Sequence, residues 1–526
     1  MAASLSSLCV SDTFISPSVF GVEIRSLEAN LITNFSTSVP DTLRFTQPSV
    51  ELKNATFCNV TVSYTHPGQN DNIFVETWLP ADNWNGRLQA VGGAGWVPGR
   101  FAVSYSAMYG AIADGYATVT TDAGVPSDDS ADPWALNSPG NVNLYNLQNL
   151  ASVSLNDEAI ISKSLIKDYY GKGPDFSYWN GCSQGGRQGL MLAQRYPTAY
   201  DGIAAGAPGI YWTSFFPYLQ WPQQTMDILG EYPYECELDA ITSAAVSTCD
   251  KLDGIVDGVI AEPDACLDAF NPFTLVNTTI NCNQTNGTIQ ISNAAAVVVN
   301  ATWQGTLSGQ GTKTGWFGYS PGADLTGNSP YSPGYQGLAS TNCSSGTCTG
   351  IPIAYGVEWL QLFGALGADL NVTNLTHAQF DDLVYAAQQR FKSTIDTSDA
   401  DLTEFRDAGG KLVVFHGIQD NTLPTKGSEK YFKEASALVS DVENFYRYFE
   451  IAGLGHCGYG PGGLPTGLFD QLRTWVENGT APEHTAIQFQ GLNGTTQDRI
   501  ACPYPQKAKL DEACGDVANA NCWSCS

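Results

Sequence analysis

The sequence predicts an α/β fold in which helices cover a mostly parallel sheet. Short runs of β-branched and aromatic residues, typical of strands, recur along both halves of the chain. Segments with a helical pattern lie between them, and this alternation is typical of parallel strands joined by helical crossovers. With 526 residues, of which 43% are hydrophobic, the chain can also bury a large core.

Each element follows from its own run of residues. Residues 72–80 (NIFVETWLP) and 87–93 (RLQAVGG) flank the turn signal NWNG and predict two strands separated by a turn. Further strands are expected at 116–121, 176–179, 411–416 and 444–451, and helices at 156–170, 187–196 and 466–478.

Residues 210–400 have a different composition and predict an inserted domain. They are rich in Gly, Ser, Thr and Asn, and 305–322 is typical of turns and loops. Two interpretations stay open, a loop-rich surface excursion and a lid over a pocket. The core then consists of 1–209 and 401–526, the second part ending in a tail with four cysteines between Cys502 and Cys525.

The charge balance excludes several classes of partner. The 24 Lys and Arg residues against 52 Asp and Glu residues give a net charge of −28. A surface this acidic repels phosphate backbones and anionic bilayers, so neither nucleic acid nor membrane is an expected partner. No run of about 18 apolar residues is present that could cross a bilayer.

Cysteines and glycosylation motifs predict a secreted protein. The 14 cysteines lack the paired CxxC spacing of zinc sites, which indicates disulfides formed in an oxidising compartment. The first ten residues lack the features of a signal peptide, so we expect it to have been removed. N-linked glycans are expected at the Asn-X-Ser/Thr motifs, which begin at Asn34, Asn54, Asn59, Asn277, Asn283, Asn286, Asn300, Asn342, Asn371, Asn374, Asn478 and Asn493.

The segment Gly181-Cys182-Ser183-Gln184-Gly185-Gly186 contains G-x-S-x-G between a predicted strand and a predicted helix. Such a turn presents a serine hydroxyl for nucleophilic attack. The N–H of Gln184, at the start of the helix, would point at a developing oxyanion. The alternative is a glycine-rich turn without chemistry.

A serine nucleophile needs a histidine base and an acid, which follow it along the chain in this architecture. His456, in the glycine-flanked loop after the strand 444–451, is the predicted base. His484 is the weaker candidate, and a structural role for His456 is the alternative. Asp420 follows the strand 411–416 and is the predicted acid, with an Asx turn as the other interpretation.

A cysteine lies next to each of two predicted catalytic residues. Cys182 precedes Ser183 and Cys457 follows His456, so contact between serine and histidine would bring the two cysteines within disulfide range. A thiol nucleophile at Cys182 would instead suit a reducing compartment. The second oxyanion donor is expected in the loop VGGAGW, at Gly93 or else Gly92.

Three carboxylates, Asp250, Asp253 and Asp257, lie at offsets 0, 3 and 7 with glycines after two of them. Such a loop can present the hard oxygen ligands that Ca²⁺ prefers, although the spacing is not that of an EF-hand. A solvated acidic loop is the other interpretation.

The combination G-C-S-Q-G-G-R, the Asp420 strand and G-H-C resembles the tannase and feruloyl esterase family, and the resemblance extends over most of the chain. It implies an α/β-hydrolase fold with a large lid, which here would follow Gly206-Ala207-Pro208. It also implies the triad Ser183, Asp420 and His456 and a disulfide between Cys182 and Cys457.

The same resemblance implies a structural calcium ion in the lid. Asp250, Asp253 and Asp257 would supply side chains, and Ile255 and Val259 would supply carbonyl oxygens. A local disulfide between Cys249 and Cys266 would close this loop.

The expected function is therefore that of a secreted serine carboxylic-ester hydrolase acting on small phenolic esters. Feruloyl esters are slightly preferred over galloyl esters, because the chain has no Lys-Arg or Arg-Arg pair for the maturation cut that the resemblance links to some tannases. An inactive glycan- or tannin-binding glycoprotein on a hydrolase scaffold is the alternative from another class.

Overall fold

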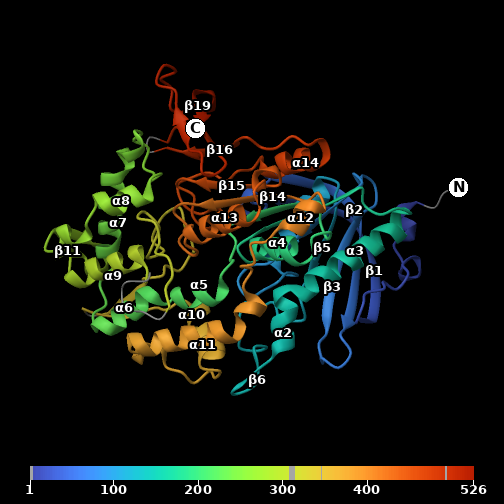
Figure 1. The fold of residues 1–526 in the computed structure, drawn as a ribbon, viewed down its shortest axis with the longest axis horizontal. Coiled ribbons are helices and arrows are strands. Elements are labelled where there is room, and N and C mark those ends of the chain that lie inside the picture. Colours follow the sequence, from blue (N-terminus) through green and yellow to red (C-terminus); the bar gives the residue numbers. More distant parts are fainter. Residues whose placement is uncertain (1–3, 307–313, 345, 492–493) are drawn as a thin grey trace.

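The computed structural model describes residues 4–306, 314–344, 346–491 and 494–526, and its centre is a nine-stranded sheet (Figure 1). The strand order is β1-β2-β3-β5-β4-β8-β9-β14-β15. The pairs from β5 to β15 are parallel, whereas β1–β2, β2–β3 and β3–β5 are antiparallel. A mostly parallel sheet with helical crossovers is the architecture of an α/β-hydrolase, as predicted.

The predicted strands are present with nearly the expected bounds. They are β3 (Ile73–Pro80), β4 (Arg87–Val91), β5 (Ala117–Thr121), β8 (Phe176–Cys182), β14 (Lys411–Gly417) and β15 (Tyr446–Ile451), joined by the short β9 (Gly202–Gly206). β3 and β4 are not neighbours, because β5 lies between them. Two long strands were not predicted, β1 (Glu23–Val39) and β2 (Val50–Thr65). β1 buries only Val39, so its sequence lacks a regular apolar face.

Helices cover both faces of the sheet. α1 (Ala102–Ala113) and α14 (Leu468–Asn478) pack on one face, and α3 (Ser154–Tyr170), α4 (Gln184–Arg195) and α13 (Lys426–Leu438) pack on the other. A π-helical segment, Asn149–Val153, leads from α2 (Leu144–Gln148) into α3. The short α12 (Thr403–Asp407) precedes β14.

The segment between β9 and β14 combines helices, which the composition did not predict, with turn-rich stretches such as 314–340, which it did predict. Its helices are α5 (Trp212–Tyr218), α6 (Trp221–Leu229), α7 (Glu235–Cys249), α8 (Pro263–Ala269), α9 (Asn293–Gln304), α10 (Ala354–Glu358) and α11 (His377–Ile395). In Figure 1 most of them form a lobe to the left of the sheet. Residues 307–313 of the predicted turn-rich stretch lie outside the described residues.

The composition did not predict these helices, because α7 and α9 are built largely from Ala, Val, Ser and Thr, and only Ala among these favours a helix strongly. Tertiary packing supplies the stability that local helix propensity does not. Buried side chains of α6, α7 and α9 form a separate core that includes Met226, Leu238 and Val298.

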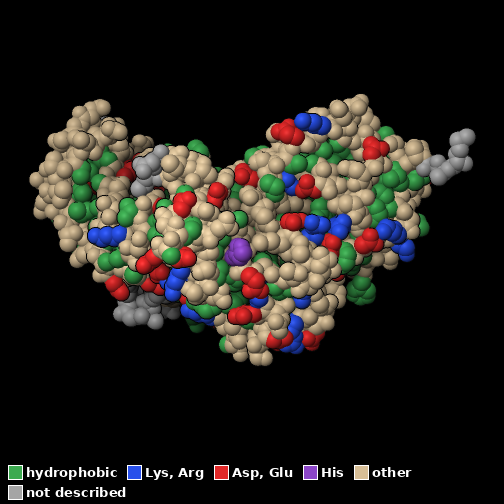
Figure 2. Space-filling model, turned by 90° about the horizontal axis from the view of Figure 1, so that it is seen from above, with side chains coloured by type: hydrophobic (Ala, Val, Ile, Leu, Met, Phe, Trp, Pro, Cys, Tyr) green, Lys and Arg blue, Asp and Glu red, His purple; other side chains and the backbone are tan. Residues whose placement is uncertain are grey.

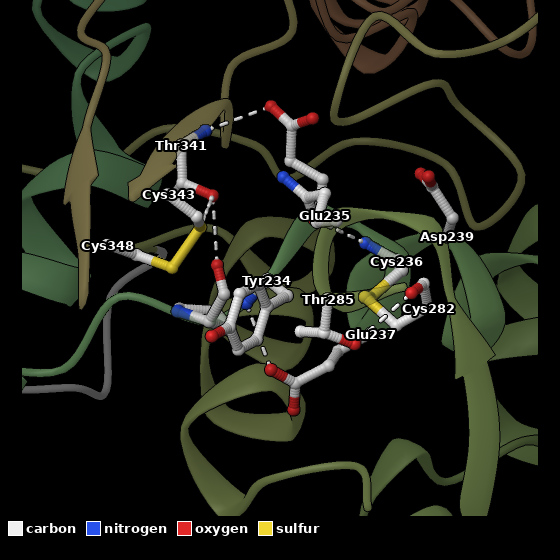
Figure 3. Close-up of a disulfide and its surroundings, with 12 residues drawn as sticks. Tyr234, Glu235, Cys236, Glu237, Asp239, Cys282, Thr285, Thr341, Cys343 and Cys348 are labelled. Atoms are coloured by element: carbon white, nitrogen blue, oxygen red, sulfur yellow. Dashed lines mark hydrogen bonds between the residues drawn. A yellow bond between two sulfur atoms is a disulfide. The ribbon is translucent and has the colours of Figure 1, made fainter. Parts of the chain in front are cut away.

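Seven disulfides are present among the described residues: Cys9–Cys58, Cys182–Cys457, Cys236–Cys282, Cys249–Cys266, Cys343–Cys348, Cys502–Cys525 and Cys514–Cys522. Figure 3 shows Cys236–Cys282 joining the start of α7 to β10 (Thr279–Cys282). Glu235, next to it, accepts the backbone N–H of Thr341 at 3.0 Å. Thr341 begins β12 (Thr341–Ser344), and Cys343–Cys348 joins β12 to β13 (Thr347–Gly350). These bonds hold the outer part of the lobe together.

The C-terminal tail forms two small ribbons, β16 (Thr485–Gln490) with β17 (Thr496–Ala501) and β18 (Ala508–Leu510) with β19 (Trp523–Cys525). Ion pairs from Arg499 to Asp257 (3.2 Å) and from Lys507 to Glu262 join it to the inserted segment. The tail therefore bridges the core and the lobe.

Charged side chains are sparse on the face seen in Figure 2, where uncharged polar side chains and backbone predominate. The outline of the molecule is hollowed between two lobes in this view. No helix of the described residues has the length and apolar character needed to cross a membrane.

Several carboxyl groups are buried, or half-buried in the case of Glu450, in positions that favour their neutral form. Burial raises the pKa of Glu450, on β15, to about 7 and that of Asp396 to about 7. Burial likewise raises the pKa of Glu158, on α3, well above its ordinary value. Such groups keep their protons in the folded state at a pH where the unfolded chain has lost them, so they make the fold more stable in acid.

Replacing Glu450 by Gln is expected to flatten the dependence of stability on pH. In the parent, the folded state keeps the Glu450 proton above pH 4.5, where the unfolded chain loses it. The free energy of unfolding therefore falls as pH rises from 4.5 to about 7, and this group accounts for up to about 3 kcal/mol of the fall. Gln keeps the acceptor for the Tyr448 hydroxyl but does not ionise. Melting temperatures between pH 4 and 8 measure the effect, with the exposed Glu443→Gln as control. An unchanged slope in Glu450→Gln would contradict the prediction.

Candidate functional site

The predicted nucleophile lies on a sharp turn between β8 and α4. Ser183 has φ 61° and ψ −118°, a backbone conformation that costs energy for any residue with a Cβ. Its N–H donates to the carbonyl of Gly206 at 2.9 Å. A Cβ on Gly186 would lie 2.3 Å from that same carbonyl oxygen, so only glycine fits there. The G-x-S-x-G-G pattern is thus required by close backbone packing around the serine.

Asp420 and His456 are in direct contact. The Oδ2 atom of Asp420 lies 2.8 Å from Nδ1 of His456, and its Oδ1 accepts the N–H groups of Thr422 (2.8 Å) and Leu423 (2.7 Å). Burial alone would raise the pKa of Asp420, but the imidazoles of His456 and His416 hold it well below its usual range. The carboxylate is therefore ionised and its orientation is fixed.

A disulfide joins the serine turn to the histidine loop. The Cys182–Cys457 bond has a Cα–Cα distance of 6.0 Å and spans 275 positions of the chain. Ser183 and His456 line the same cavity. The structure thus places Ser183 and His456 on the wall of one cavity, with Asp420 in contact with His456.

Three of the other histidines, His66, His377 and His484, lie away from Ser183 and Asp420. His66 is paired with Asp71 (2.6 Å) and Asp157 (3.2 Å), and the exposed His484 immediately precedes β16. His377 starts α11 and lies 3.8 Å from Asp381. None of these three lines the cavity that contains Ser183.

The cavity has a volume of 660 Å³ and a largely apolar, aromatic wall. Lys, Arg, Asp and Glu are absent from its lining within the described part of the chain. The core and the inserted segment both contribute to the wall, which includes Leu43, Phe45, Val103, Trp212, Phe215, Phe216, Leu219, Tyr331, Pro333, Tyr335, Tyr355, Leu423 and Tyr459.

Two backbone groups beside the serine differ in their availability as donors. Gln184 is the first residue of α4, so its N–H has no partner within the helix. The N–H of Gly93 instead donates to Oε1 of Gln188 at 2.9 Å, which occupies the donor that the sequence assigned to the oxyanion. Gly95, in the same loop, also lines the cavity, and its N–H has no partner among the described residues.

Gln188 connects this loop to α4 by two hydrogen bonds. The sequence did not predict this role. Its Nε2 donates to the carbonyl of Pro98 at 2.9 Å while its Oε1 accepts from Gly93. The N–H of Gly185 adds a bond to the Gly93 carbonyl at 3.0 Å. The sequence carried no signal for this role, because the partners of an amide are defined only by the folded chain.

Arg187 supports the first turn of α4. Its Nε donates to Oε1 of Gln184 at 2.6 Å, and its other nitrogens donate to the carbonyls of Leu150 (2.9 Å) and Ala151 (2.8 Å). Those carbonyls belong to the π-helical segment, where the regular i to i−4 pattern is interrupted. The arginine of G-C-S-Q-G-G-R thus has a structural reason for its position.

Gln419, next to Asp420, connects three loops. Its backbone N–H donates to Leu454 (3.0 Å) and its Nε2 to the carbonyl of Ile260 (2.6 Å), while its Oε1 accepts from the N–H of Gly453. The acid loop, the histidine loop and the acidic loop of the inserted segment are therefore joined through one buried amide.

Two tyrosines of the inserted segment hold the acid loop from the other side. The Tyr335 hydroxyl donates to the carbonyl of Asn421 at 2.8 Å, and the Tyr319 hydroxyl donates to that of Thr422 at 3.0 Å. The inserted segment is thus fastened to the residues that follow Asp420.

The loop with the predicted calcium ligands is curled around its own carboxylates. Asp250 accepts the N–H groups of Asp257 (3.0 Å) and Gly258 (3.1 Å), and Asp253 accepts that of Ile255 at 2.9 Å. The N–H of Val259 donates to Asp257 at 3.2 Å. Cys249–Cys266 closes the loop.

The charges of this loop repel one another. Burial, together with the charges of Asp253 and Asp250, raises the pKa of Asp257 to about 6, although Arg499 acts in the opposite direction. A hard cation would relieve this repulsion, so the donor set fits Ca²⁺ chemically. The side chains are not arranged as a metal cluster, since no group of three or more His, Cys, Asp or Glu ligands is formed among the described residues.

Comparison with known proteins agrees with this geometry. The profile of the family described as "Tannase and feruloyl esterase" matches residues 58–526. A protein of Arthroderma benhamiae named "Probable feruloyl esterase" is 36% identical over 490 residues, which cover 91% of this chain and 88% of that protein.

Two solved structures share the fold along nearly the whole chain. The tannin acyl hydrolase of Aspergillus niger has a TM-score of 0.85 and 26% identity, covering 100% of this chain and 96% of its own. Feruloyl esterase B of Aspergillus oryzae has a TM-score of 0.75 and 24% identity, covering 97% of both chains. From the family match, the related sequence and the serine turn described above, the chain belongs to the tannase and feruloyl esterase family of carboxylic ester hydrolases.

Proposed function

We propose that this esterase uses Ser183 as nucleophile, His456 as general base and Asp420 as the acid that orients the imidazole. The observation that carries the proposal is the contact of Asp420 with His456 beside a strained serine that lines the same cavity. Asp420 fixes the tautomer of His456 with Nε2 free to take the serine proton, and it stabilises the imidazolium that results.

The reaction then proceeds in two halves. Ser183 Oγ attacks the ester carbonyl as His456 takes its proton, and the oxyanion is stabilised by the N–H of Gln184 and by that of Gly95, in place of Gly93. His456 gives the proton to the leaving alcohol, which departs from the acyl-enzyme. Water, deprotonated by His456, attacks the acyl carbonyl and releases the acid with Ser183 restored.

The cavity wall favours feruloyl over galloyl esters. Gallate carries three hydroxyls that need hydrogen-bond partners, and a wall without charged side chains offers few. The hydroxyls of Tyr335 and Tyr355 already donate to Asn421 and Asp129. An apolar aromatic slot suits a planar ring with a methoxy group, and the name of the Arthroderma benhamiae relative is consistent with that choice.

Purified enzyme is expected to hydrolyse methyl ferulate with a kcat/KM about tenfold or more above that for methyl gallate, because the galloyl hydroxyls lose hydrogen bonds on entering the cavity. Initial rates on both esters, with methyl butyrate as an aliphatic reference, measure the ratio. Ser183→Ala is the control and should abolish turnover without changing the melting temperature. A preference for methyl gallate would favour the galloyl alternative, and turnover by Ser183→Ala would exclude the serine mechanism.

Removing the Cys182–Cys457 bond by the double substitution Cys182→Ala, Cys457→Ala is expected to lower kcat by about tenfold or more, because the serine and histidine loops are no longer held in register. Stability should also fall, with about 5 kcal/mol as an upper figure for a loop of this length. The matched control is Cys514→Ala, Cys522→Ala in the tail, which should leave kcat unchanged. Parent-like kcat in the first variant would show that the bond does not position the site.

We further propose that the Asp250–Val259 loop holds a structural calcium ion. Asp250, Asp253 and Asp257 would supply carboxylate oxygens, and Ile255 and Val259 carbonyl oxygens, in keeping with the hard donor set and the mutual repulsion of the carboxylates. The ion would stabilise the loop, whose Ile260 carbonyl contacts Gln419.

Chelation is expected to lower the melting temperature by several degrees, because an ion present at about 100 times its Kd contributes about 2.7 kcal/mol. Differential scanning fluorimetry with EDTA, followed by excess CaCl₂, measures the loss and its recovery. Asp250→Asn should reduce the response to EDTA, whereas the exposed Asp268→Asn in α8 should retain it. An EDTA response equal in both variants would contradict this site.

We also propose that the protein acts outside the cell and carries N-linked glycans, as seven disulfides and the exposed motifs support. Exposed asparagines of this kind include Asn34, Asn54, Asn277, Asn283, Asn286, Asn342, Asn371, Asn374 and Asn478. Asn59 is a poor site for glycan attachment, because its side-chain amide donates a hydrogen bond to Glu76 at 2.9 Å. Asn493 lies outside the described residues.

A further inference from the structure

A second histidine contacts the acid of the proposed triad. His416 lies near the end of β14, four positions before Asp420, and is only 1% exposed. Its Nε2 lies 3.0 Å from Oδ2 of Asp420, the same oxygen that Nδ1 of His456 approaches to 2.8 Å. Two imidazoles therefore share one carboxylate oxygen.

The surroundings of His416 define which nitrogen carries the proton. Nε2 faces two acceptors, Oδ2 of Asp420 and, at 3.2 Å, the carbonyl of Leu423, so Nε2 must be the N–H donor. Nδ1 lies 2.8 Å from the hydroxyl of Ser428 on α13, which can donate to it. A neutral His416 with the proton on Nε2 satisfies every polar atom of this group.

The carboxylate of Asp420 needs this donor. Its Oδ1 is occupied by the backbone N–H groups of Thr422 and Leu423, so Oδ2 is left for the imidazoles. Asp420 is 1% exposed, and water is not at hand to replace a missing partner. Without His416, Oδ2 would have one donor only, and a buried carboxylate with an unpaired oxygen is costly and free to turn about its Cβ–Cγ bond.

We propose that His416 is a positioning residue of this esterase, which holds Oδ2 of Asp420 in the direction of His456 and shares its negative charge. The proposal rests on the proposed function of Ser183, Asp420 and His456. His416 touches no substrate and acts through Asp420, so its loss should lower kcat rather than raise KM. The acid of the site then belongs to a chain that runs from Ser428 through His416 and Asp420 to His456.

Three substitutions separate the hydrogen bond to Asp420 from a role in packing. His416→Leu removes the donor and fills the space, whereas His416→Gln places an amide N–H near the position of Nε2. Ser428→Ala removes the link between β14 and α13 but leaves the Nε2 donor in place. The substrate is 4-nitrophenyl acetate, an activated ester that reports the serine chemistry whatever the natural acyl group.

We expect His416→Leu to lower kcat by about 10- to 100-fold with KM unchanged, by analogy with the loss of triad orientation in serine hydrolases. His416→Gln should recover most of this loss, and Ser428→Ala should stay within about threefold of the parent. Rates are expressed per active site, counted by a fluorophosphonate that labels Ser183, so that unfolded protein does not enter the comparison.

Equal losses in His416→Leu and His416→Gln, or a parent-like kcat per active site in His416→Leu, would overturn the positioning role. If His416→Leu does not fold, His416→Asn replaces it, because its amide is too short to reach Asp420 and it should lose activity that His416→Gln keeps. Retention of activity in His416→Asn would overturn the proposal equally. Failure of the proposed function is a different result, since Ser183→Ala would then match the parent on the same ester.

Discussion

The buried, ionised carboxylate of Asp420 is the constraint around which the site is built. A charge without access to water must be met by donors, and the fold supplies two backbone N–H groups and two imidazoles. These donors come from β14, from the loop after it and from the histidine loop. The connections around the site join these loops to one another.

The inserted segment takes part in that placement. Tyr319 and Tyr335 bind the loop after Asp420, and Ile260 reaches the acid and histidine loops through Gln419. The segment therefore does more than cover the cavity, because its aromatic residues form the wall and its hydroxyls fix the acid. The same segment therefore lines the cavity and holds the loop that follows Asp420.

The residues that line or contact the site could largely be predicted from the sequence, whereas the residues that hold them in place could not. The serine turn could be predicted because close backbone contacts there require glycines. The cysteines next to Ser183 and His456 indicated that these two residues lie near each other. Strand β1 was missed because its half-buried apolar residues do not alternate regularly across its register shifts. Strand β2 was missed although Val60, Val62 and Tyr64 alternate on its buried face. The helices α7 and α9 were missed because packing rather than local propensity stabilises them. Gln188 and Gln419 carry no sequence signal, since an amide's partners are defined only by the folded chain.

The Cys182–Cys457 bond closes a covalent ring of the chain that contains the whole inserted segment. Substitutions, insertions or deletions within that ring change the wall of the cavity, yet they cannot carry the histidine away from the serine. The wall of the cavity can therefore vary in evolution while Ser183 and His456 stay near each other. One core of this kind can give rise to esterases for differently substituted aromatic acids.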